Sequence, residues 1–246
     1  MFILVRVKAF LFHLLISALI ALLAAGLVFF VWYPAPLHMA AGVTSIFLLL
    51  LVIDVILGPS LTLLVYKPGK KTLVMDLTVI ALLQLSALAY GLYTVADGRP
   101  AWLVFAKDRF EMVRVPDIDE RKLDEAPADY RTPPWFGPKW VAATNPDSTE
   151  ERNELMFEAL FASIDLAQRP NLYQPLNSQH DVIAQRARPL PELEQYNPPA
   201  QVRKALKRHP QADGWLPLKA VAEDMTVLIN RANGEVIAIV NLRPWS

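Results

Sequence analysis

The chain has 246 residues, of which 54% are hydrophobic, and its formal net charge is zero because 24 basic residues balance 24 acidic ones. Only seven charged side chains precede Asp97, so the first third excludes an ordinary soluble domain and indicates membrane segments. There is no cysteine, which excludes disulfides and thiol chemistry.

Three apolar stretches predict three transmembrane α-helices, at about residues 9–33, 37–66 and 72–96. The first stretch has 25 residues without Asp, Glu, Lys or Arg, more than the roughly 20 needed to cross a hydrocarbon core. Asp54 is the only charge in the second stretch, and Asp76 is the only one in the third. The first apolar region is too long for a signal peptide, and two further spans follow it, so we expect no cleavage.

Basic residues predict the orientation of these spans. Arg6 and Lys8 precede the first span, and the lysine-rich loop 67–71 joins the second to the third, whereas the YPAPL joint between the first two is uncharged. The positive-inside tendency places the N-terminus and the lysine loop in the cytoplasm. We therefore expect a bacterial inner-membrane protein with a three-helix transmembrane domain at 1–97 and a periplasmic domain at 98–246.

The outer part, about 150 residues long, is large enough for one domain with its own core. Two β-prone runs within residues 99–115 predict a hairpin. A helix is expected from a capping box at Ser148 and Glu151 to Arg169-Pro170. The last 32 residues predict three short strands, the final two joined by Asn233-Gly234. The periplasmic domain is therefore predicted to be α+β, with antiparallel strands from both of its ends in one sheet.

The sequence offers no catalytic, metal or cofactor motif. Its four histidines are far apart and form no metal-binding pattern: His13, His38, His180 and His209. Phosphate-binding glycine loops and a nucleophile elbow are also missing. The basic cluster at 203–209 fits a solvated face or one near anionic headgroups better than nucleic-acid recognition, because no aromatic side chains interleave it.

Polar residues inside the spans are more informative. Asp54 lies 12 residues inward from Tyr66, or about 18 Å, and Gln84 lies 12 residues inward from Thr72 on the next helix. The two side chains are therefore expected at the same depth. Either they bond to each other and fix helix packing, or Asp54 faces a groove that accepts a polar group from another membrane helix. Gly58 and Pro59 add a kink and a close-approach surface.

The order of these features resembles the type IV pilin accessory protein family, the TfpX/TfpZ group. The resemblance is dense from residue 1 to about 115 and looser beyond. It rests on the three spans and on these motifs: DVILGPSLTLLVYKPGKKTLVMDL at 54–77, Gln84, Tyr90-Gly91, Arg99-Pro100 and Asp108-Arg109-Phe110. It implies a non-catalytic inner-membrane factor, without a cofactor, that stabilises or presents a particular major pilin for pilus assembly.

The implied partners are the lipid bilayer and a major type IV pilin, through both its transmembrane helix and its periplasmic head. We expect a client-helix groove at Asp54, Gly58, Pro59 and Gln84. We also expect a collar where the chain leaves the membrane, formed by Arg99, Pro100, Asp108, Arg109 and Phe110. Two alternatives stay open: a membrane-bound pilin-modifying enzyme, and a periplasmic sensor or scaffold.

Overall fold

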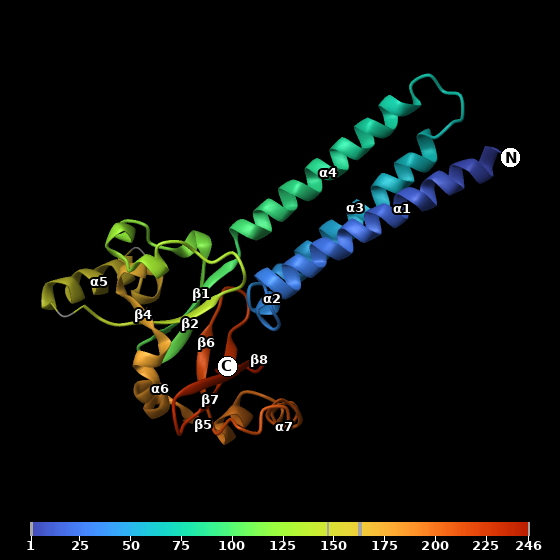
Figure 1. The fold of residues 1–246 in the computed structure, drawn as a ribbon. Coiled ribbons are helices and arrows are strands. Elements are labelled where there is room, and N and C mark those ends of the chain that lie inside the picture. Colours follow the sequence, from blue (N-terminus) through green and yellow to red (C-terminus); the bar gives the residue numbers. More distant parts are fainter. Residues whose placement is uncertain (1, 147, 162–163, 246) are drawn as a thin grey trace. The chain divides into compact units, whose positions relative to one another are not determined.

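The computed structural model describes residues 2–146, 148–161 and 164–245 (Figure 1). The chain forms two compact units. The first contains the chain up to Val31 together with Val43–Gly98, and the second contains Trp32–Gly42 together with the chain from Arg99 onward.

Three helices make up the first unit. They are α1 (Phe2–Gly26), which continues as a π-helix over Leu27–Trp32, α3 (Val43–Val65) and α4 (Leu73–Asp97). All three are long and apolar enough to cross a membrane. The expected fold class, three apolar N-terminal helices followed by a domain with a sheet, is confirmed.

Helix α3 lies beside both α1 and α4 (Figure 1). The guanidinium of Arg6 on α1 donates hydrogen bonds to the carbonyls of Leu63 and Leu64, at 3.0 and 2.8 Å. These carbonyls belong to the last turn of α3, where helix geometry leaves carbonyl groups without partners. A basic residue of the first helix therefore caps the end of the second.

An eight-stranded sheet organises the second unit. Its strands are β1 (Pro100–Ala106), β2 (Arg109–Arg114), β3 (Lys139–Ala143), β4 (Tyr173–Pro175), β5 (Arg188–Pro189), β6 (Gly214–Lys219), β7 (Met225–Asn230) and β8 (Glu235–Val240). Their order is β4-β3-β1-β2-β6-β7-β8, with β5 paired to β6. The two ends of the domain thus meet at β2 and β6.

The sheet is mixed. The hairpins β1–β2, β6–β7 and β7–β8 are antiparallel, and the turn signals predicted the first and the last of them. However, β1 pairs with β3 and β2 pairs with β6 in parallel. Parallel neighbours need long connections. The chain between β2 and β6 supplies this length. Besides strands, it contains the short helices α5 (Thr149–Phe161), α6 (His180–Arg186) and α7 (Pro199–Leu206). It also contains the 3₁₀ turns Val115–Asp117, Leu123–Glu125, Ala128–Tyr130, Leu166–Gln168, Pro170–Leu172, Leu176–Gln179 and Leu190–Gln195.

Helix α5 differs from its prediction at its C-terminal end. The N-cap half of the predicted capping box forms, since the Glu151 amide donates to the Ser148 hydroxyl at 3.1 Å. The helix stops at Phe161 rather than at Arg169-Pro170; residues 162–163 of the predicted helix lie outside the described residues. Phe157, Leu160 and Phe161, which recur at helical spacing, are all exposed, and Leu155 is the buried residue of the helix.

The segment between the first two long helices belongs to the second unit. It was expected to begin the second span at residue 37, but α3 begins at Val43, after Gly42 with a φ of 71°. The short helix α2 (Leu37–Ala40) packs in the sheet core, where Leu37 and Ala40 are buried. The Ala40 carbonyl accepts hydrogen bonds from the amides of Ala222 and Glu223. This loop is therefore a structural part of the second unit, which we call the outer domain after its expected orientation.

Candidate functional site: a polar centre in the helical unit

Gln84 on α4 is the hub of a polar centre within the membrane-spanning helices. Its amide nitrogen donates to the Ser17 hydroxyl of α1 at 2.9 Å and to the Asp54 carbonyl of α3 at 3.2 Å. The same nitrogen lies 3.4 Å from the Asp54 carboxyl oxygen Oδ2. One amide therefore links all three helices, which suits an environment where water supplies no alternative partners.

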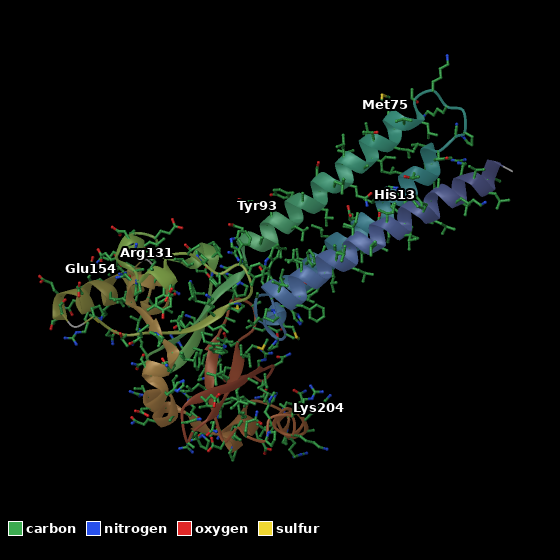
Figure 2. All side chains as sticks on the ribbon, in the orientation of Figure 1. His13, Met75, Tyr93, Arg131, Glu154 and Lys204 are labelled. Atoms are coloured by element: carbon green, nitrogen blue, oxygen red, sulfur yellow. The ribbon has the colours of Figure 1, made fainter. Side chains whose placement is uncertain are left out.

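His13 on α1 completes the centre (Figure 2). Its Nε2 lies 3.1 Å from Oε1 of Gln84, and its Nδ1 lies 2.7 Å from the Thr62 hydroxyl of α3. Because Oε1 only accepts hydrogen bonds, Nε2 must carry the proton. A neutral ring with that tautomer satisfies both contacts, since Nδ1 then accepts from Thr62.

Gly58 lets Gln84 reach this position. A Cβ atom at residue 58 would lie 1.8 Å from Oε1 of Gln84, so only hydrogen fits there. Pro59 follows inside α3 and is buried. Proline has no amide hydrogen, so Pro59 removes the helix hydrogen bond to the Val55 carbonyl. The Asp54 carbonyl, one residue earlier, accepts from Gln84. The glycine thus creates the space that the glutamine uses.

A groove of about 440 Å³ runs between α3 and α4 over this centre. Asp54 and Gln84 provide its polar groups, and both side chains are partly exposed. The remaining lining is apolar or glycine: Ile46, Leu49, Leu50, Ile53, Leu57, Gly58, Leu61, Ile80, Leu83, Ala87 and Leu88. The groove is therefore mostly apolar, with one polar patch formed by Asp54 and Gln84.

The structure thus brings together three of the four predicted groove residues, with Pro59 adjoining them. Sequence reasoning missed His13, Ser17 and Thr62. A signal for them was present, because His13 and Ser17 are four residues apart, and Asp54, Gly58 and Thr62 recur every four residues. That spacing places each set on one helix face.

The predicted collar residues do not share one surface. Arg99 is buried, donates to the Pro134 carbonyl at 3.1 Å and lies 4.1 Å from the centre of the Trp135 ring. Pro100 begins β1 and is also buried. Phe110 is fully buried and packs against Trp140. These three side chains stabilise the domain from within.

The hairpin turn is the exposed part of this region. Asp108 is exposed, and Arg109 pairs with Glu111 at 3.0 Å. Lys107, with a φ of 61°, binds the Asp165 carboxylate at 2.7 Å. Burial opposes ionisation of Asp165, but hydrogen bonds from Lys107 and the Leu166 amide outweigh it and lower the pKa of Asp165. The turn is thereby fixed to the domain.

Among the described residues, no group of three or more His, Asp or Glu side chains is arranged to hold a metal ion. The polar centre contains one carboxyl and one imidazole, and both are engaged in hydrogen bonds between helices. What this arrangement can do is join helices at mid-span and offer a polar contact to a further helix.

Three candidate membrane spans, a polar centre between them and a mixed-sheet domain define a membrane-inserted protein of the helical class. The model of the family "Fimbrial assembly protein FimB" matches residues 2–42. Two curated fimbrial assembly proteins of Dichelobacter nodosus, of serogroups I and E1, are each 38% identical over 180 residues, covering 72% of this chain and 70% of theirs.

A third such protein, of serogroups C1 and C2 of the same organism, is 41% identical over 117 residues, which is 47% of this chain and 87% of its own. The chain belongs to the fimbrial assembly protein family. Its role accordingly lies in fimbrial biogenesis. No solved structure matches it.

Proposed function

We propose that the protein holds a major type IV pilin in the bacterial inner membrane before assembly, without catalysing a reaction. The pilin's transmembrane helix lies in the α3–α4 groove, and the pilin's head contacts the outer domain in the periplasm. The N-terminus and the lysine loop 67–71 face the cytoplasm in this proposal. The fimbrial assembly relatives support a role in pilus assembly, and the groove supports binding of the client through its transmembrane helix.

One observation carries the proposal: the Asp54 carboxyl faces the groove with an uncommitted oxygen. Within the part of the chain that the structure describes, Gln84 is the one side chain that hydrogen-bonds this carboxyl, through Oδ2. An aspartate at the centre of a span costs about 2.5–3.5 kcal/mol on insertion scales, so it is retained where it has a use. A donor on a guest helix would satisfy the second oxygen.

The apolar lining gives the guest its remaining contacts. Helices associate in membranes through close packing and interhelical hydrogen bonds, because lipid tails are as apolar as leucine. Ala87, the smallest side chain on the α4 side of the groove, allows close approach there. A single apolar helix, as expected of a pilin's transmembrane segment, suits this groove.

The test is photo-cross-linking in the native bacterium. Probes at Leu57 and Leu83, which line the groove, should capture the major pilin, whereas a probe at Leu15, which is 69% exposed on α1, should not. Asp54→Asn and Gln84→Ala should each reduce capture about threefold or more. That factor corresponds to about 0.6 kcal/mol, a typical interhelical hydrogen bond.

The level of the protein itself distinguishes the two roles of the polar centre. If the Asp54 and Gln84 variants lower the protein's own level in parallel with capture, the residues serve internal packing and the groove proposal fails. Capture of only lipid or of a second copy, with pilin levels unchanged on deletion, would overturn the holding function altogether.

A further inference from the structure

Strand β8 forms the longer open edge of the outer-domain sheet (Figure 1). It pairs with β7 on one side, and among the described residues no other strand pairs with it. The residues of β6 and β7 are almost all buried, whereas Val236, Ile237, Ala238 and Ile239 of β8 are partly exposed. An edge strand presents unpaired amides and carbonyls, which makes it a template for another strand.

A groove of about 390 Å³ adjoins the C-terminal end of this edge. Its apolar wall comes from β8 and the chain just after it, through Ile239, Val240 and Leu242, and Pro36 also lines it. The opposite wall is basic and comes from Lys204 of α7 and from Arg208 and His209 just beyond that helix. The groove therefore has an apolar wall on the β8 side and, opposite it, a basic rim formed by Lys204 and Arg208.

Among the residues that the structure describes, the basic rim has no acidic partner. Lys204 and Arg208 are exposed, and across the described parts of the chain neither forms an ion pair or a side-chain hydrogen bond. Figure 2 shows Lys204 on α7. Lys107 and Arg121 are paired with carboxylates, whereas Arg203 and Lys207 are exposed like Lys204 and Arg208. Lys204 and Arg208 differ from Arg203 and Lys207 in lining the groove, where their charges can meet a ligand.

We propose that β8 and this groove bind an extended, acidic peptide segment of another protein by strand addition. The backbone of the segment pairs with the β8 edge, its alternate apolar side chains contact Ile239, and its carboxylates pair with Lys204 and Arg208. An anionic membrane surface would need only the charge, whereas the site also supplies an open strand edge and a concave apolar wall. The proposal goes beyond the helix-holding function and uses a different unit of the chain.

The experiment measures binding of a labelled peptide to the full chain in nanodiscs of neutral phosphatidylcholine. The probe is an eight-residue peptide of alternating valine and glutamate, long enough to cover the six residues of β8. We expect saturable binding by fluorescence anisotropy. The same peptide with lysine in place of glutamate should bind at least tenfold more weakly.

Backbone pairing is tested on the ligand, so that the fold of the protein is untouched. Two further probes carry N-methyl groups on alternate amides, one set starting at the first residue and the other at the second. A strand pairs through every second residue on each side. One methylated peptide should therefore lose binding at least tenfold, and the other should bind within about twofold of the parent.

Charge reversal on α7 provides the matched protein variants. Lys204→Glu with Arg208→Glu should weaken binding at least tenfold. Arg203→Glu with Lys207→Glu makes the same charge change in the same segment, at exposed residues that do not line the groove, and should weaken binding about threefold or less at physiological salt.

Three results would overturn the proposal: equal binding of the glutamate and lysine peptides, equal binding of the two methylated peptides, or equal loss in the two double variants. A fourth would assign the rim to lipid. In that case, phosphatidylglycerol vesicles would bind the outer domain through Lys204 and Arg208 while the peptide failed to bind. All of these binding measurements report on the outer domain. The cross-linking test of the α3–α4 groove can therefore give a negative result without changing them.

Discussion

At position 58, no side chain larger than a hydrogen atom fits beside Gln84. A Cβ there would come within 1.8 Å of Oε1, the atom that accepts from His13. The Gly58→Ala variant must therefore move the glutamine and weaken the contacts that join three helices. Overpacking of this kind costs about 1–3 kcal/mol. We expect a lower midpoint of thermal unfolding, followed by circular dichroism in detergent.

Gly26 supplies the control for this prediction, because a Cβ at that residue would meet nothing within 4 Å. Gly26→Ala, at the end of α1, should leave stability unchanged or raise it by up to about 1 kcal/mol, the helix-propensity gain over glycine. Equal midpoints for the two variants would show that the glycine is not required for the polar centre.

Counting residues from the ends of the spans was enough to predict that Asp54 and Gln84 lie at the same depth, and the structure brings them within 3.4 Å of each other. Depth along a helix follows from its fixed rise, so two adjacent helices can be compared without a structure. Rotation about the helix axis does not follow from counting. That is why His13 and Ser17, which approach from α1, were not assigned to the centre. Phe110 was misjudged for a related reason: its motif was noted, but which face of β2 is buried depends on strand pairing.

Among the elements, α2 shows where hydropathy misleads. Residues 37–42 are as apolar as a span, yet Leu37 is only 2% exposed in the core of the outer domain. Leu37→Ala should destabilise that domain by about 2–5 kcal/mol, the usual cost of a buried leucine truncation. All six tryptophans lie in the second unit, so tryptophan fluorescence during denaturation reports on it selectively.

Met39 is the comparison residue on the same short helix, since it is 37% exposed. Met39→Ala should shift the unfolding midpoint much less than Leu37→Ala. Matching shifts would indicate that α2 only rests on the domain. A large shift at Leu37 alone would mean that the loop between the first two spans contributes to the stability of the outer domain through its buried side.

Local signals predicted the hairpins well, because a turn such as Asn233-Gly234 fixes strand pairing over a few residues. The parallel pairs β1–β3 and β2–β6 join residues far apart in sequence, and no local pattern encodes them. Likewise, the stripe of Phe157, Leu160 and Phe161 has helical spacing but remains exposed. Periodicity shows which residues share a face and leaves open whether that face is covered.

For the whole molecule, the proposed function depends on which side of the membrane each unit occupies. The lysine loop at 67–71 and Arg6 predict a cytoplasmic N-terminus and an outer domain across the membrane. The natural chain has no cysteine, so single cysteines can report each side without background. Pro68 in the lysine loop and Ala232 in the β7–β8 turn are both exposed, and their replacement leaves the charge unchanged.

In intact cells, a membrane-impermeant maleimide should label Ala232→Cys and leave Pro68→Cys unmodified, while both should react after the inner membrane is permeabilised. The cysteine-free parent is the control and should not react. The reverse pattern would place the outer domain in the cytoplasm, where no pilin head is exposed, and the holding function would fail with it. Labelling as expected would put the β8 edge in the compartment where a pilin head and other envelope proteins can reach it.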